Sequence, residues 1–341
     1  MGLGQLRDPS SGIARPSQAG AAAIDPLLAV DPDLRDAARQ IVAEPGQPLT
    51  LATIAKVRTL WPVPPALGAP APQPETLGIP GAPGDPDVSV QVIGRLGGGT
   101  PRPAIVHMHG GGLVSGTAAH STAFCQMLAS EFDCVVVNVD YRRAPETPFP
   151  GPVEDNYAAL KWVHAKAADL GVDRRRIAVM GESAGGGLAA MLALLARDRG
   201  ELPVCFQLLI YPMLDDRTGG ARRPTGAIGQ VGWSAEANAF GWSAFLGGDA
   251  GREAPPPGSV PARVEDLSGL PATFIGVGAV DLFVDEDMAY ARRLVRAGVA
   301  TELHVAPGAF HAFDFVVPEA RVSRAFTAAW KAALANAFAS A

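Results

Sequence analysis

Lysine is the rarest charged residue in this 341-residue chain. Only four of its 28 basic residues are lysines, at positions 56, 161, 166 and 331, and the arginines form no marked cluster. With 34 acidic residues the formal net charge is −6. Nucleic acids and anionic membranes bind proteins through concentrated positive charge. The composition therefore argues against both as partners.

Cysteine and long hydrophobic segments are also scarce. The three cysteines, an odd and small number, make a disulfide framework improbable, so we expect a reducing, cytoplasmic location. The longest apolar run, residues 184–196, spans 13 residues, whereas a membrane helix needs roughly 20. The first residues lack the charged, apolar and small-residue regions of a secretion signal. No membrane association is expected.

The sequence has enough apolar residues for a large core and a clear alternation of patterns. Strand-like runs occur at 88–93, 104–109, 134–141, 177–181, 204–211, 272–278 and 301–306, and helical patterns at 120–132, 152–169, 184–199, 285–298 and 318–338. Near-continuous apolar strands separated by helices predict an α/β fold with a parallel sheet covered on both faces. Such sheets place their chemistry at the carboxyl ends of the strands.

Two regions lie outside this alternation. Residues 1–24 are predicted to be flexible, and helical patterns at 31–42 and 49–60 precede a proline-rich connector at 61–75. About 60 residues between Tyr211 and Leu270 contain no strong strand pattern. A structureless loop of that length is uncommon, so the interval predicts a partly helical insertion.

The segment Gly-Glu-Ser-Ala-Gly at 181–185 lies between a predicted strand and a predicted helix. A sharp strand-to-helix turn can present Ser183 as a nucleophile, and it requires glycine at positions 181 and 185, where a Cβ atom would clash. The amide of Ala184, at the start of the helix, would then face the serine oxygen. A glycine-rich turn without chemistry is the alternative.

A second glycine-rich segment, His-Met-His-Gly-Gly-Gly at 107–112, follows another predicted strand. The amides of Gly110, Gly111 and Gly112 are candidates for an oxyanion hole, because glycines let the backbone approach a ligand closely. His109 is interpreted as an anchor of this loop, and His107 as a buried strand histidine. A flexible loop is the alternative, and no nucleotide-binding motif accompanies it.

An acid and a base follow at later strand ends. Asp281 closes one predicted strand and His311 lies in the turn after the next. The rivals are three acids at the start of a helix, where they favour the helix dipole, and a histidine within a strand: Asp285, Glu286, Asp287 and His304. The order Ser183, Asp281, His311 is the one expected of an α/β-hydrolase.

Five motifs together resemble the hormone-sensitive-lipase-like family of bacterial esterases. They are HGGG (109–112), YRRAPETPFP (141–150), GESAGGG (181–187), DLFVDE (281–286) and GAFHAFD (308–314). The similarity extends from about residue 25 to the end of the chain. Arg143 and Ala312 depart from the usual pattern, and the insertion is unusually rich in Gly, Ala and Pro.

The resemblance implies an α/β-hydrolase core with a mostly parallel eight-stranded sheet and a mainly helical cap. The implied cap consists of residues 25–72 and 213–268, and the core of residues 73–212 and 269–341. Carboxylester hydrolysis of small, short- to medium-chain acyl esters is implied, without cofactor or metal. Family members also form dimers, so a homodimer is compatible with the resemblance.

The resemblance also assigns supporting roles. Arg142, Glu146 and Asp155 are expected to tie the loop after residue 140 beneath the site, and Glu182 to support the turn or to tune His311. Four aromatic residues of the insertion are candidates for the substrate pocket, with core packing as the alternative: Trp233, Phe240, Trp242 and Phe245.

Other activities remain open at this stage. A ligand-binding protein that keeps the hydrolase fold without its activity would typically have its base histidine replaced, yet His311 is present. Amidase, lactonase and carbamate hydrolase chemistry would use the same three residues. An acyltransferase would require an alcohol to outcompete water at the acyl-enzyme, and no sequence feature indicates this.

Overall fold

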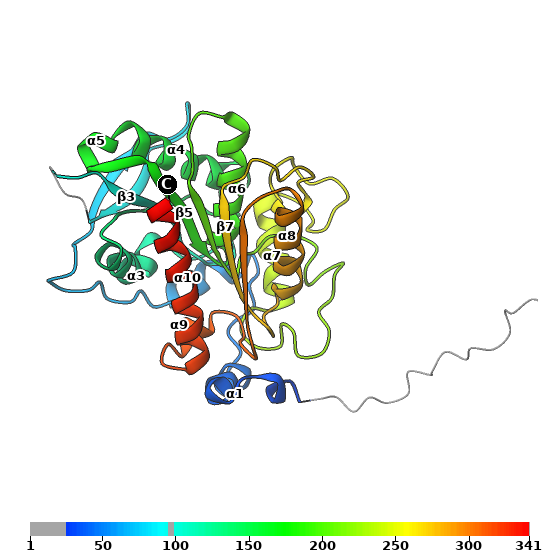
Figure 1. Ribbon diagram of the computed structural model, residues 1–341. Helices are drawn as coiled ribbons and strands as arrows, with labels where there is room; N and C mark the ends of the chain where they lie inside the picture. Colours follow the sequence, from blue (N-terminus) through cyan, green and yellow to red (C-terminus); the bar gives the residue numbers. More distant parts are fainter. Residues whose placement is uncertain (1–24, 95–98, 341) are drawn as a thin grey trace, which may run out of the picture.

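The computed structural model describes residues 25–94 and 99–340, so the N-terminal residues 1–24 that we predicted to be flexible lie outside the described part. An eight-stranded sheet with the order β1-β2-β4-β3-β5-β6-β7-β8 forms the centre of the molecule (Figure 1). Its strands are β1 (Glu75–Ile79), β2 (Val88–Ile93), β3 (Arg102–Met108), β4 (Val135–Asp140), β5 (Val172–Glu182), β6 (Phe206–Ile210), β7 (Ala272–Gly278) and β8 (Thr301–Ala306). β2 runs antiparallel to β1 and β4, and the other pairs are parallel. The prediction of a mostly parallel sheet is confirmed.

Helices cover both faces of the sheet. One face packs against α4 (Gly151–Ala165), α6 (Ala184–Arg199) and α8 (Val284–Arg296), and the other against α3 (Ala118–Glu131) and α10 (Arg321–Ser340). The short helices α5 (Ala167–Leu170) and α9 (Phe313–Val316) precede β5 and α10. Neighbouring residues of β3 point to opposite faces: Val106 belongs to the hydrophobic core on the side of α4, α6 and α8, and Ile105 to the core on the side of α3 and α10. Since both faces are buried, the central strands are apolar at most positions.

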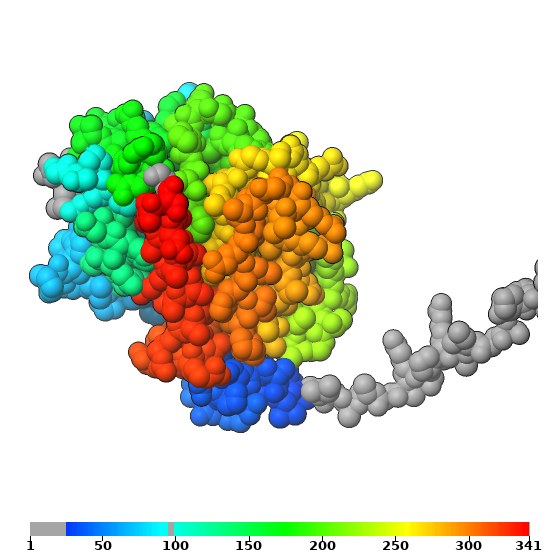
Figure 2. All heavy atoms as spheres, viewed as in Figure 1, coloured from blue at the N-terminus to red at the C-terminus, as the bar shows by residue number. Residues whose placement is uncertain are grey.

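The N-terminal segment, residues 25–72, forms η1 (Pro26–Ala29), η2 (Pro32–Leu34), α1 (Arg35–Ala43) and α2 (Ile54–Leu60). Figure 2 shows its first part, in blue, against the orange-red region that leads into the C-terminal helix. Arg321 at the start of α10 pairs there with Asp31, at 3.1 Å. The segment therefore packs on the core although it lies far from α10 in sequence.

The insertion, residues 213–268, follows β6 and contains α7 (Ala235–Leu246) and η3 (Pro261–Arg263). Its partly helical character agrees with the sequence prediction. α7 is buried along one side through Trp242, Phe245 and Leu246, which join the core shared with α4 and α6. The insertion is thus part of the same packed body as the sheet.

Two further properties follow from the described residues. Cys125, Cys134 and Cys205 are all free. Among residues 25–94 and 99–340, no helix combines the length and apolar character needed to cross a bilayer.

Candidate active site

Ser183 occupies a strained turn between β5 and α6. Its φ is 57° and its ψ is −120°, a conformation that non-glycine residues rarely adopt unless the surroundings enforce it. The Ser183 amide donates to the carbonyl of Ile210 at 2.9 Å, and the Ser183 carbonyl accepts from the amide of Met213 at 3.0 Å. The end of β6 therefore holds the serine backbone on both sides.

The two glycines beside Ser183 are required by space. A Cβ atom at Gly181 would lie 2.3 Å from the carbonyl carbon of Gly185, and one at Gly185 would lie 2.0 Å from the carbonyl oxygen of Met108. Real Cβ atoms do not approach backbone atoms so closely. The local sequence thus fits the turn that presents a serine hydroxyl at the end of a strand.

Three side chains that are far apart in sequence meet at this edge of the sheet. The Nε2 atom of His311 lies 2.9 Å from Ser183 Oγ, and its Nδ1 atom lies 2.9 Å from Asp281 Oδ2. Asp281 is fully buried, and its Oδ1 atom accepts from the amide of Phe283 at 3.0 Å. A carboxylate, an imidazole and a hydroxyl in this order can remove the hydroxyl proton as the oxygen attacks a carbonyl.

The rival acids and the rival histidine lie elsewhere. Asp285 is exposed, and Glu286 accepts the amides of Leu214 and Asp215 at 2.6 and 3.2 Å. Burial raises the pKa of Glu286 and of Asp287 well above the usual range, which favours neutral acids there. The rings of His304 and Phe326 of α10 meet in a T-shaped contact.

The glycine loop after β3 lies beside Ser183. A Cβ atom at Gly110 would be 3.6 Å from the Cβ atom of Ser183. Within the described residues, the amides of Gly110, Gly111, Gly112 and Ala184 donate to no backbone carbonyl. Free amides around a nucleophile can stabilise an oxyanion.

His109 anchors this loop. Its Nδ1 atom lies 2.8 Å from the Gly110 carbonyl oxygen, its ring stacks on Tyr141 at 4.2 Å, and the Tyr141 hydroxyl donates to the His109 carbonyl at 2.7 Å. Burial lowers the pKa of His109 to about 3, so the ring is neutral in ordinary buffers. A role as general base is not supported by these contacts.

Glu182 belongs to a buried polar pair behind the turn. Its carboxylate lies 3.0 Å from Nε2 of His107, whose Nδ1 atom lies 3.0 Å from Oδ1 of Asn138. These contacts tie β5, β3 and β4 together. The geometry fits support of the turn, and it confines His107 to the sheet.

The charged residues of the YRRAPE segment make framework contacts. Arg142 pairs with Asp155 at 2.7 Å and with Asp85 at 2.9 Å. Glu146 pairs with Arg58 at 2.7 Å. Arg58 lies in the N-terminal segment and was not singled out from the sequence.

The four aromatic candidates of the insertion divide into two pairs. Trp233 and Phe240 are half-buried, whereas Trp242 and Phe245 are fully buried in the core. A Cβ atom at Gly112 would lie 2.3 Å from the ring of Trp233, so this ring sits directly on the glycine loop. Trp242 and Phe245 fill the space between α7 and the core, which favours the core-packing alternative for these two rings, and their role in the substrate pocket stays a prediction.

Tyr211 is a site residue that the sequence analysis missed. It follows β6 directly, its φ is 34°, and its ring meets that of His311 edge-on at 4.9 Å. Its position after a strand end was the available signal, since the same rule selected Asp281. Phe283 also meets His311 edge-on, at 5.2 Å.

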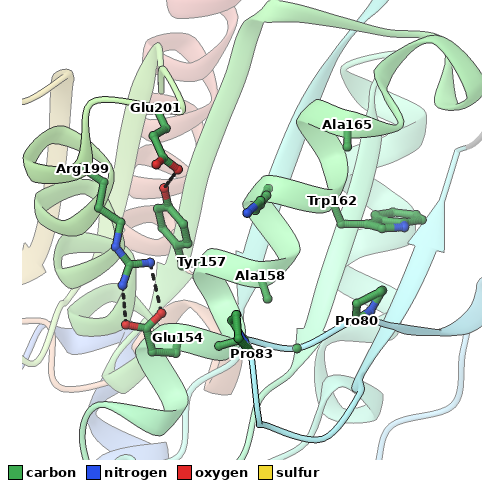
Figure 3. Close-up of a pocket in the computed structure, with 12 residues that line it drawn as sticks. Pro80, Pro83, Glu154, Tyr157, Ala158, Trp162, Ala165, Arg199 and Glu201 are labelled. Atoms are coloured by element: carbon green, nitrogen blue, oxygen red, sulfur yellow. Dashed lines mark hydrogen bonds and ion pairs between the residues drawn. The ribbon is translucent and has the colours of Figure 1, made fainter.

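A separate surface hollow of about 550 Å³ lies away from these residues (Figure 3). The loop at 80–83, one side of α4 and the end of α6 line it. Arg199 bonds to Glu154 at 2.6 Å and Glu201 accepts from the Tyr157 hydroxyl at 3.1 Å, so its polar rim is largely self-paired. None of the candidate site residues lines this hollow.

Metal ligands are not grouped in the described part of the chain. There, no set of three His, Cys, Asp or Glu side chains is placed so that it could hold a metal ion. The candidate chemistry at Ser183 depends on side chains and backbone amides.

Comparison with known proteins agrees with this geometry. Residues 105–315 match the model of a family described by the alpha/beta hydrolase fold. The esterase LipI of Mycobacterium tuberculosis is 38% identical over 217 residues, which cover 62% of this chain and 65% of LipI. The carboxylesterase NlhH of the same species is 39% identical over 227 residues, which cover 64% of this chain and 69% of NlhH. The chain thus aligns with about two thirds of the length of these curated relatives.

The structural similarity extends further along the chain. A solved bacterial heroin esterase superposes with a TM-score of 0.79 and 35% identity, covering 92% of this chain and 99% of that one. This structural match covers more of the chain than the family model, which spans residues 105–315. By sequence and by structure, this chain belongs to the α/β-hydrolase fold family, in its hormone-sensitive-lipase-like branch of bacterial carboxylesterases.

Proposed function

We propose that this protein hydrolyses carboxylic esters with small, short- to medium-chain acyl groups, with Ser183, His311 and Asp281 as its catalytic residues. The observation that carries the proposal is the continuous contact from Asp281 through His311 to the Ser183 hydroxyl, with 2.9 Å at each step. The names of the esterase relatives support it independently.

In the proposed reaction, Ser183 Oγ attacks the ester carbonyl while His311 Nε2 takes its proton. Asp281 orients the ring and stabilises the imidazolium. The amides among Gly110–Gly112 and Ala184 bind the tetrahedral oxyanion, and each such donor contributes about 3–4 kcal/mol to transition-state stabilisation. His311 then protonates the leaving alcohol, which leaves an acyl-serine.

The second half of the reaction uses the same groups. His311 takes a proton from water, whose oxygen attacks the acyl carbonyl, and Ser183 leaves with that proton as the acid is released. Atoms balance as one ester and one water giving one acid and one alcohol. No cofactor is needed for either half.

The half-buried rings of the insertion support the restriction to small acyl groups. Trp233 covers Gly112, so a substrate carbonyl bound at the loop would have this ring beside it. We also propose that the N-terminal segment and the insertion act together as the cap of the site. A homodimer and a cytoplasmic location stay predictions.

The test is the Ser183→Ala variant with p-nitrophenyl butyrate as substrate. We expect turnover to fall by about 10⁴- to 10⁶-fold, because the nucleophile is lost. Circular dichroism should show an intact fold, and Ser130→Ala, an exposed serine of α3, should keep full activity. A Ser183→Ala protein with more than a tenth of the parent activity would refute the proposal.

Substrate panels distinguish the neighbouring chemistries. p-Nitrophenyl esters from C2 to C12 report the depth of the acyl pocket, and matched anilides and lactones report amidase and lactonase activity. We expect ester turnover to exceed anilide turnover by at least about 100-fold, because an amine is the poorer leaving group. A ligand-binding protein would bind these compounds without turnover.

A further inference from the structure

Arg58 of α2 connects the N-terminal segment to the loop that carries the candidate oxyanion amides. Its Nε atom donates to the carbonyl of Val114 at 2.7 Å, and its Nη2 atom donates to the carbonyl of Ala144 at 2.8 Å. Nη1 and Nη2 also donate to the two carboxylate oxygens of Glu146, at 2.7 and 2.8 Å. All three nitrogens of one guanidinium are thus used, and the side chain is 19% exposed.

The loop that Arg58 holds is strained. Gly111, Gly112 and Leu113 have φ values of 127°, 61° and 69°, three consecutive residues with positive φ. For a leucine this conformation costs roughly 1–2 kcal/mol. Such backbone persists only where surrounding contacts determine it.

The segment at 143–144 provides such contacts, and Arg58 touches both that segment and the loop. The Ala144 amide donates to the Leu113 carbonyl at 3.2 Å, and Arg143 donates to the Gly116 carbonyl at 2.5 Å. Arg58 binds the carbonyls of Val114 and Ala144, one on each segment, so it fixes the two chains against each other. Guanidinium is suited to this role because its planar fork spans two acceptors.

We propose that Arg58 is a positioning residue for the oxyanion hole, through which α2 holds the glycine amides in the orientation that binds the tetrahedral oxygen. The inference rests on the proposed function, since it assigns Arg58 to the same site. Arg58 touches no reacting atom and acts through Val114 and Ala144. A small displacement of the loop amides lowers the rate of the chemical step more than substrate binding.

A substitution of Glu146 distinguishes a positioning role of Arg58 from a role as one half of a surface ion pair. The hydrogen bonds from Arg58 lower the pKa of Glu146 to about 2, so the pair stays charged at ordinary pH. The Glu146 side chain is 62% exposed, however, and exposed pairs contribute little to stability. Glu146→Ala removes the ion pair and leaves both carbonyl contacts of Arg58.

The experiment compares Arg58→Ala, Arg58→Lys and Glu146→Ala with the parent enzyme. For Arg58→Ala we expect kcat for p-nitrophenyl butyrate to fall about 10- to 100-fold, with KM within about threefold. Glu146→Ala should keep kcat within about threefold, and Arg58→Lys should lie between, because one ammonium cannot bind both carbonyls in a fixed plane. Arg39→Ala, which removes an exposed pair within α1, is the matched control.

A second measurement detects misfolding. Titration of Ser183 with a p-nitrophenyl phosphonate counts competent sites, and kcat is calculated per titrated site. The second-order rate of phosphonylation should fall with kcat, since the phosphoryl oxygen uses the same amides. If Arg58→Ala does not fold, Arg58→Lys decides: a kcat below the parent supports the proposal, and a kcat equal to the parent overturns it.

Three results would refute the proposal. One is an unchanged kcat per titrated site in Arg58→Ala, and another is an equal loss in Arg58→Ala and Glu146→Ala, which would assign the effect to the ion pair. A rise in KM alone would place Arg58 in substrate binding. Absence of ester turnover in the parent enzyme would refute the proposed function. The role of Arg58 is tested separately, by the ratio of the variant's kcat to the parent's kcat.

Discussion

The N-terminal segment and the insertion both contact the loops of the candidate site, but they do so by different means. The N-terminal segment uses hydrogen bonds that reach outward: Arg58 binds Val114 and Ala144, and the Asp31 amide donates to the carbonyl of Gly308 at 2.9 Å. Gly308 begins the turn that carries His311. The Arg58 donors can be removed by truncating the side chain, whereas the Asp31 donor belongs to the backbone.

The insertion contacts the same loops at glycines, where the absence of a side chain lets its backbone approach closely. A Cβ atom at Gly229 would lie 2.8 Å from Leu282, one at Gly232 would lie 3.3 Å from His311, and one at Gly241 would lie 2.3 Å from the carbonyl oxygen of Gly112. The backbone of the insertion therefore lies directly on the aspartate, histidine and glycine loops. We expect truncation of a donor side chain to disrupt the N-terminal contacts. We expect addition of a methyl group at a glycine to disrupt the contacts of the insertion.

Gly241→Ala tests the second half of this comparison, and we expect it to have a larger effect than the Trp233 and Asp314 substitutions. Alanine favours helix by about 1 kcal/mol over glycine, so α7 itself would gain stability, yet the new methyl group meets a backbone oxygen. We expect kcat/KM to fall at least about 10-fold. Gly220→Ala is the matched control in the insertion, because its Cβ atom would find its nearest neighbour at 3.8 Å. Equal activity of the two variants would contradict the direct contact.

Trp233→Ala sharpens the comparison by removing atoms from the insertion. Its ring covers Gly112 and its Nε1 donates to Asn238 at 3.3 Å, so truncation should open space beside the loop without disturbing the glycine contacts. We expect the ratio of kcat/KM for octanoate over acetate esters to rise about fivefold. Trp61→Ala, in the N-terminal segment and 40% exposed, should leave the ratio unchanged.

A smaller effect is expected in the histidine loop, which both regions contact. Burial raises the pKa of Asp314 to about 7 from its ordinary 3.8, with Tyr211, Glu182 and His311 among its charged or polar neighbours. Between these values the folded chain keeps a proton that the unfolded chain releases, so the free energy of unfolding decreases as pH rises from about 4 to 7. Asp314→Asn should flatten this decrease.

The measurement is the melting temperature at several pH values. We expect the fall in Tm between pH 5 and 7 to be smaller in Asp314→Asn by about 2–4 °C. Glu286 and Asp287 contribute a decrease of the same sign, so part of the slope should remain. Parallel curves for parent and variant would show that Asp314 does not hold this proton.

The sheet was predictable because strands that are buried on both faces have nearly continuous runs of apolar residues. The bounds of β2, β7, β8 and α6 coincide with the predicted ranges. β1 was missed because it is a short edge strand with four partly or fully exposed residues, and its sequence has no apolar run. Edge strands of this kind make few packing contacts, so their sequences carry no clear apolar pattern.

The N-terminal helices were predicted too long, for a local reason. Pro32 starts a 3₁₀ turn, and α1 begins only at Arg35. Thr53 donates to the carbonyl of Pro48 and exchanges bonds with Thr50 before α2 begins at Ile54. Threonine hydroxyls compete in this way with the helical hydrogen bonds of the backbone.

At the site, the position of the strand ends predicted the three candidate catalytic residues, although Tyr211 was missed at another strand end, and residues whose contacts depend on distant packing were not predicted. Ser183, Asp281 and His311 each follow a strand, so their meeting could be expected from topology. Arg58 meets its partners across 56 and 86 residues, and no local pattern marks such a pairing. The distinction between Trp233 and Trp242 also depends on how α7 lies on the core.

The glycines that follow Ser183 have a consequence for folding. Each glycine weakens an isolated helix by about 1 kcal/mol relative to alanine, and α6 has three in its first turn, where Cβ atoms at Gly186 and Gly187 would meet Pro212 and Met213. We therefore expect this helix start to become stable only when the chain after β6 packs against it. If Ser183 is the nucleophile, as we propose, we expect a nascent or partly unfolded chain to lack an activated serine, and ester turnover to report the completed fold.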